Sequence, residues 1–163
     1  DYGRYPYRSW RTIGRSKEDR EAVARALAET RLEAMRTRQV MSLSGGERQR
    51  AWIAMALARQ PEYLLLDEPT TYLDIAHQLE VMEIIKRLNR EHAMTVIMVL
   101  HDINHALQYA DEIAVIKDKR IFSRGTPHDV LNVAMLAEVF GVHADIFTNS
   151  QGAQVLSPVS LVR

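Results

Sequence analysis

The chain has 163 residues with 21 basic and 21 acidic side chains, so its formal net charge is zero. Nothing in this balance indicates general binding to nucleic acid or to an anionic membrane. The absence of cysteine excludes a disulfide framework, a thiolate metal site and a thiol nucleophile. The longest apolar run, residues 51–58, is too short to cross a bilayer. No signal-peptide pattern opens the chain, and we expect it to be part of a longer protein.

The first part of the chain is expected to be a loop followed by helices. Residues 1–10 are polar and aromatic, as is typical of a connecting loop. Ser16 opens a segment that resembles a capping box, and apolar residues then recur at helical spacing. This pattern predicts a helix over about residues 17–29 and a shorter one near residues 33–36. Val40 and Leu43 are then expected to pack against the next helix.

The next helix has the clearest start signal in the chain. Ser44 is a favourable N-cap residue, and Glu47 follows at the spacing of a capping box. Gly45 and Gly46 between them leave backbone N–H groups uncovered. These groups and the helix dipole make such a helix start a suitable anion site, although an ordinary capped helix has the same local sequence. Pro61 is expected to end the helix.

The rest of the chain alternates apolar runs with helical patterns, which predicts an α/β fold with a mostly parallel sheet. In the helix expected at residues 75–91, Leu79, Met82, Ile85 and Leu88 lie on one face. We expect buried parallel strands at 63–66 and 95–100, a strand at 112–117 that forms a hairpin with 120–124, helices at 103–109, 126–131 and 133–140, and a small hairpin from 146–148 and 153–156.

Three segments then occur in a fixed order: LSGGERQR at Leu43–Arg50, YLLLDEPTTYLD at Tyr63–Asp74, and VLHD at Val99–Asp102. Together they resemble the ATP-binding subunit of an ABC transporter. The resemblance covers nearly the whole chain and implies part of a P-loop NTPase fold. It implies a helical subdomain at 1–59, a portion of the ATPase core at 60–125, and C-terminal helices with a hairpin at 126–163.

The resemblance also implies roles for the acidic pair and the histidine. Asp67 would hold Mg²⁺, through water, and Glu68 would polarise the attacking water. His101 would contact the γ-phosphate of ATP. From the residues alone, Asp67 and Glu68 could instead form an acidic helix-capping turn, and His101 could be structural. His101 and His105 have a spacing that also suits a metal, but no third ligand is visible.

The segment Leu43–Arg50 corresponds to the signature motif of the family. By resemblance, Ser44, Gly45, Gly46 and Gln49 would close over the γ-phosphate of ATP held by an opposing subunit. Asp74 corresponds to the D-loop, which in the family crosses the dimer interface, and it could equally be a helix N-cap.

The 163 residues contain no Gly-x-x-x-x-Gly-Lys-Ser/Thr sequence, so the P-loop of the family is missing from them. We therefore expect this chain alone neither to bind ATP tightly nor to hydrolyse it. In the family the P-loop strand lies beside the strand that carries the acidic pair. Residues 63–66 should then lack a neighbour, and we expect the chain to self-associate, to exchange elements or to be only partly ordered.

We interpret the parent protein as an ATPase, with ATP and Mg²⁺ as cofactors, at the cytoplasmic face of the cell membrane. It would form a head-to-tail dimer and drive a permease served by a substrate-binding protein. Residues 3–7 are similar to those of importers for iron chelates, haem and cobalamin, and residues 70–72 to those of siderophore importers. These similarities suggest an iron–siderophore or related metal-chelate cargo. One alternative is a soluble ABC ATPase of DNA repair or chromosome maintenance, although such proteins carry long coiled-coil or zinc insertions around the signature. Another is a non-enzymatic half-domain that acts in association.

Overall fold

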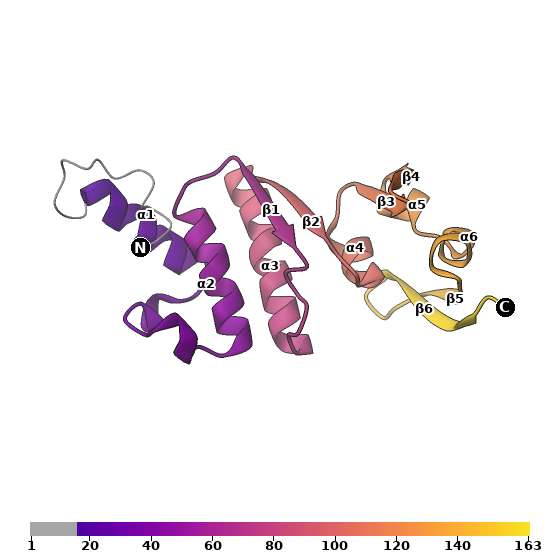
Figure 1. The fold of residues 1–163 in the computed structure, drawn as a ribbon, viewed down its shortest axis with the longest axis horizontal. Coiled ribbons are helices and arrows are strands. Elements are labelled where there is room, and N and C mark those ends of the chain that lie inside the picture. Colours follow the sequence, from indigo (N-terminus) through magenta and orange to yellow (C-terminus); the bar gives the residue numbers. More distant parts are fainter. Residues whose placement is uncertain (1–15) are drawn as a thin grey trace. The chain divides into compact units, whose positions relative to one another are not determined.

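The computed structural model describes residues 16–163, which form two compact units (Figure 1). The first unit ends at Val99, and the second runs from Leu100 to Arg163. The expected loop at residues 1–10, including the segment 3–7 that resembles iron-chelate importers, lies outside the described residues. Between residues 16 and 163, no helix combines the length and the hydrophobicity that a membrane crossing requires.

The first unit begins with helix α1 (Lys17–Glu29), whose bounds are those predicted. Ser16 caps it by accepting a hydrogen bond from the Asp19 backbone N–H at 3.0 Å. The shorter helix expected near 33–36 is a 3₁₀ turn at Glu33–Met35, and a second 3₁₀ turn covers Val40–Ser42. Leu43 is buried as expected.

Helix α2 (Gly45–Leu57) packs against α1 and supplies much of the core of this unit. Ile53, Ala54 and Leu57 are buried on one side of it. The helix ends several residues before Pro61, and the chain turns through Gln60, which has a positive φ of 55°. Strand β1 (Tyr63–Asp67) follows.

Strands β1 and β2 (Thr95–Val99) form a parallel pair, and α3 (Ile75–His92) lies on one face of it (Figure 1). Leu64 is buried, whereas Leu65, the next residue and therefore on the opposite face of the pair, is 71% exposed. The sequence predicted both strands to be buried. Half of each strand is exposed because the described residues supply a covering helix on only one face.

The core-facing side of α3 is rotated from the predicted one. Met82, Ile85 and Leu88 are buried as expected, but Leu79 is 43% exposed. Val81 and Ile84 are buried in its place. The buried residues of α3 therefore begin at Val81, and the residues before it are exposed or half-buried.

The second unit is built around two antiparallel hairpins and short helices. Its core cluster is Leu107, Val115, Val130, Leu131, Met135, Leu136 and Leu156. The helices are α4 (Ile103–Tyr109), α5 (Pro127–Val130) and α6 (Val133–Met135), the last continuing into a π-helical turn at Leu136–Phe140. The hairpins are β3 (Ile113–Lys117) with β4 (Arg120–Gly125), and β5 (Val142–Thr148) with β6 (Gln154–Leu161).

A side chain holds α4 onto the second hairpin. Asn104 donates from Nδ2 to the Leu156 carbonyl at 3.0 Å, and its Oδ1 accepts from the Leu156 backbone N–H at 2.9 Å. This hairpin is longer than predicted. Among the described strands β1–β2 is the only parallel pair, so the mostly parallel sheet expected from the sequence is here a partial one.

Candidate functional site

The start of α2 is a complete capping box, as its sequence predicted. Ser44 Oγ accepts from the Glu47 backbone N–H at 3.3 Å, and Glu47 Oε2 accepts from the Ser44 backbone N–H at 2.8 Å. Gly45 and Gly46 occupy the first two helical positions, where backbone N–H groups have no acceptor within the helix. Ser44 and Gly45 are exposed, and Gln49 lies one turn further along, half-buried.

Gly46 differs from Gly45 because it is buried. A β-carbon on Gly46 would lie 2.5 Å from Cγ and 2.9 Å from Cβ of His77, closer than side chains approach. A β-carbon on Gly45 would make ordinary contact with Leu73 Cδ2 at 3.7 Å. Within the first unit, the two glycines therefore contact the turn before α3 and the first turn of α3.

The acidic pair lies where β1 ends. Asp67 is exposed at the last position of the strand, and Glu68 has left the strand with a positive φ of 48°. The Glu68 backbone N–H donates to the Val99 carbonyl at 3.1 Å. Thr71 Oγ1 donates to Glu68 Oε2 at 3.0 Å. The backbone of Glu68 is thus held by β2, and its carboxylate is oriented by the following turn.

Asp74 is the N-cap of α3, as one of its two predicted roles required. The N-cap does not exclude the other role, at a dimer interface. Its Oδ1 accepts from the His77 backbone N–H at 2.9 Å and lies 2.7 Å from His77 Nδ1. These hydrogen bonds, the backbone one first, lower the pKa of Asp74. Asp74 is therefore an ionised, exposed carboxylate at a helix start.

One turn beyond these contacts, α2 and α3 are joined by an ion pair. Arg50 of α2 donates from Nη1 to Glu80 Oε2 of α3. Arg50 is buried, whereas the Glu80 side chain is 42% exposed. A guanidinium in such a position needs a carboxylate partner, so this pair fixes how the two helices lie against each other.

His101 lies in the second unit, exposed, directly after the unit boundary. Asp102 caps α4 by accepting from the backbone N–H groups of Asn104 at 2.8 Å and His105 at 3.1 Å. His105 is buried and makes an edge-to-face contact with Tyr109, with ring centroids 6.2 Å apart. The described part of the chain brings no three metal-ligating side chains together.

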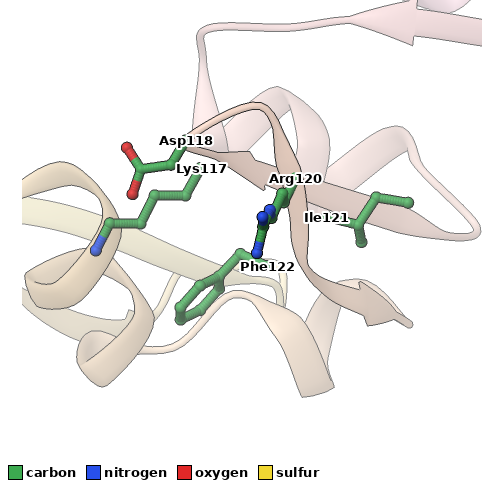
Figure 2. A pocket seen from close by; sticks show the side chains of 5 residues that line it. All are labelled: Lys117, Asp118, Arg120, Ile121 and Phe122. Atoms are coloured by element: carbon green, nitrogen blue, oxygen red, sulfur yellow. The ribbon is translucent and has the colours of Figure 1, made fainter.

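Two hollows lie away from these residues. One, of about 710 Å³, is lined mainly by apolar side chains of α1, α2 and the turns between them, together with Arg36, Thr37 and Arg38. The other, of about 540 Å³, lies at the β3–β4 hairpin, where Figure 2 shows Lys117 and Phe122 on one side and Ile121 on the other. Lys117 Nζ donates to the Glu138 carbonyl at 2.8 Å.

The first unit thus contains Ser44, Gly45, Gly46, Gln49, Asp67, Glu68 and Asp74, and His101 belongs to the second unit. Sequence reasoning missed His77 and Thr71, which hold Asp74 and Glu68. A histidine three positions after an Asp N-cap is a signal that could have pointed to His77.

Comparison with known proteins identifies the family. The profile described as ABC transporter matches residues 6–71. The petrobactin import ATP-binding protein FpuC of Bacillus anthracis is 56% identical over 152 residues, which are 93% of this chain and 55% of that protein. The chain belongs to the ABC transporter ATP-binding family. It spans about half the length of the curated relatives that it matches.

Solved structures support the same fold. An ABC transporter described as of metal-chelate type, in an inward-facing conformation, matches this ABC chain with a TM-score of 0.88 and 26% identity, covering 96% of this chain and 64% of that one. The dimeric ATP-binding cassette MJ0796, bound to ADP and Pi, matches with a TM-score of 0.60 and 34% identity, covering 72% of this chain and 51% of that one.

Proposed function

We propose that the protein containing this chain hydrolyses ATP and powers an ABC importer for an iron–siderophore or related metal chelate. The observation that carries the proposal is one compact unit that joins an exposed, capped helix start to an acidic pair at a strand end. The cargo class is supported by the petrobactin import protein, which is 56% identical over 93% of this chain.

In this proposal Glu68 is the base that polarises the attacking water. Phosphoryl transfer needs such a residue to be positioned more than it needs covalent chemistry. Two features of Glu68 fit the role: the β2 carbonyl that accepts its backbone N–H at 3.1 Å, and the Thr71 hydroxyl that donates to its carboxylate at 3.0 Å. His101 is proposed to contact the γ-phosphate.

Asp67 is the proposed magnesium ligand, through water. Its carboxylate is exposed at the end of β1, and Mg²⁺ takes oxygen ligands while keeping most of its waters. When bound, magnesium neutralises charge on the phosphates. Ser44, Gly45, Gly46 and Gln49 are proposed to meet the γ-phosphate, since the helix start offers N–H donors and a hydroxyl.

The proposed assembly is a head-to-tail dimer in which the signature segment and Asp74 face nucleotide on the opposing subunit. The dimeric MJ0796 cassette, 34% identical, supports a dimer. The further partners are a permease and, indirectly, a substrate-binding protein, with the ATPase at the cytoplasmic face of the membrane. Nucleic acid is not among the proposed partners.

Nucleotide titration of the 163-residue chain tests the prediction that these residues alone neither bind ATP tightly nor hydrolyse it. These residues contain no P-loop sequence, and therefore no P-loop lysine or cradle for the β- and γ-phosphates. We expect neither tight ATP binding nor turnover. Affinity in the micromolar range together with hydrolysis would contradict this prediction.

The parent activity is tested in the full-length protein by Glu68→Gln, with Glu91→Gln as the control because Glu91 is an exposed carboxylate near the end of α3. Glu68→Gln should abolish hydrolysis and retain ATP binding, and Glu91→Gln should leave both hydrolysis and ATP binding unchanged. Uptake of radioactive iron on a siderophore by cells carrying each variant tests the cargo class. Normal uptake with Glu68→Gln would refute the proposal, and salt-sensitive DNA binding would favour the DNA-repair alternative.

A further inference from the structure

The signature segment and the turn before α3 contact each other within one chain. Gly45 lies against Leu73, and Gly46 lies beneath His77. Leu73 and Asp74 belong to the turn that begins at Glu68, where Thr71 already donates to the Glu68 carboxylate at 3.0 Å. A continuous series of contacts therefore runs from the proposed base to the proposed phosphate-binding helix start.

His77 is held in its position by its own helix cap. Its ring nitrogen Nδ1 lies 2.7 Å from Asp74 Oδ1, and its backbone N–H donates to the same oxygen at 2.9 Å. The side chain is 34% exposed, so it is partly buried between the two helices. Because the carboxylate holds one edge of the ring, the opposite edge stays over Gly46.

The position of Gly46 has no room for a side chain. The space that a β-carbon would fill is occupied by the imidazole ring, whose Cγ is 2.5 Å from that point. Real β-carbons do not approach other atoms so closely, so a side chain at residue 46 would force the His77 ring or the backbone to shift. Glycine is therefore required here by packing against His77, whereas Gly45 remains exposed.

The contact continues along the helices. Arg50 lies one turn after Gly46 in α2, and Glu80 lies one turn after His77 in α3, and the two form an ion pair. Residues one turn apart share a face of a helix. The first two turns of α2 and α3 are therefore joined twice, once by ring packing and once by charge.

We infer that His77 is a positioning residue. Its ring fills the space over Gly46 while it is bound to Asp74. It thereby makes the start of α2, which carries the signature residues, move together with the D-loop residues before α3. The inference rests on the proposed function where it concerns catalysis. Because the signature turn would serve the opposing subunit's ATP, loosening it should slow turnover and leave ATP binding unchanged.

A double-mutant cycle in the full-length protein tests the contact without using activity. Gly46→Ala should lower the midpoint of thermal unfolding by about 5 °C, because the new methyl group meets the ring. In a His77→Ala background the same substitution should cost clearly less, since the ring is gone and only the contact with the β-carbon of residue 77, at 2.9 Å, remains. An equal loss in both backgrounds would overturn the inference.

Hydrogen exchange gives a second readout if Gly46→Ala does not fold. His77→Ala should speed exchange of the amides of residues 44–47, and His92→Ala, another histidine of α3 far along the helix, should not. Unchanged exchange with His77→Ala would overturn the inference.

Steady-state kinetics separates positioning from general stability. His77→Phe keeps a ring over Gly46, whereas His77→Asn keeps a donor for Asp74 and leaves Gly46 uncovered. We expect His77→Asn to lower kcat about tenfold with KM for ATP unchanged, and His77→Phe, which keeps a ring but loses the hydrogen bond to Asp74, to lower kcat less. A wild-type kcat for His77→Asn would overturn the catalytic part. If the wild-type protein does not hydrolyse ATP, the proposed function is wrong. The double-mutant cycle measured by thermal unfolding would still test whether His77 packs against Gly46.

Discussion

Ser44 and Glu47 hold the start of α2 by two reciprocal hydrogen bonds, of 3.3 Å to the serine hydroxyl and 2.8 Å to the glutamate carboxylate. The backbone N–H of Ser44 is the main reason that the pKa of Glu47 lies below its ordinary value of 4.5. A lowered pKa in the folded state contributes stability above the ordinary value. That contribution is lost as the pH falls through the folded-state pKa.

The capping box should therefore weaken on acidification below 4.5. Exchange of the Ser44 amide hydrogen, measured by NMR and corrected for its intrinsic pH dependence, should rise in that range. In Glu47→Gln the amide should be less protected at neutral pH, and its protection should vary less with pH. Glu91→Gln is the control, since Glu91 is exposed in the last turns of α3. A Ser44 amide with the same corrected pH profile in Glu47→Gln would contradict this account.

Removing the serine hydroxyl tests the other half of the capping box. Ser44→Ala leaves the Glu47 backbone N–H without its acceptor and should cost about 1 kcal/mol of stability. Ser150→Ala, in the exposed turn between β5 and β6, should leave the free energy of unfolding unchanged. Denaturant unfolding followed by circular dichroism compares the two, and equal midpoints would show that the hydroxyl contributes nothing.

The sequence predicted the elements with strong local signals. The bounds of α1 and α4 match the predicted ranges, and the Ser44 capping box forms as expected, because each depends on residues only a few positions apart. The type I′-like turn at Asp118–Lys119, with positive φ at both residues, joins the predicted hairpin.

Features that depend on tertiary packing were not predictable in this way. Leu79 fits the apolar stripe of α3 but is exposed, because the sheet and α2 cover a different side of that helix. The ring of His77 over Gly46 joins two segments distant in sequence, and neither residue alone signals the contact. The roles proposed for Glu68, His101 and the signature residues come from the family resemblance, since local patterns were equally compatible with caps and turns.

The side-chain amide of Asn104 is expected to stabilise the second unit. It satisfies both backbone groups of Leu156, whose side chain is 2% exposed. Asn104→Ala would leave those groups unpaired and should cost about 1–3 kcal/mol. Gln108→Ala, on the exposed side of the same helix, should be neutral. The measurement is the midpoint of thermal unfolding of the second unit, residues 100–163. Equal midpoints for the two variants would contradict the prediction.

The uncovered face of β1 and β2 leads to the last prediction. Leu65 and Ile97 are cross-strand neighbours, 71% and 56% exposed, and each strand has one edge without a described partner. Apolar side chains beside open strand edges are a template for pairing with another chain. We therefore expect the 163-residue chain to self-associate through this face.

Light scattering across a concentration series measures this association. The double variant Leu65→Glu with Ile97→Lys places opposite charges side by side, which keeps the strands compatible while making the face polar. It should shift the chain toward monomer. Ile116→Lys, at a similarly exposed strand position of the second unit, should leave association unchanged. This control shows whether association depends on the β1–β2 face or on exposed apolar side chains in general. A wild-type chain that is a sharp monomer with a cooperative melt would contradict the prediction, because the open face would then need no partner.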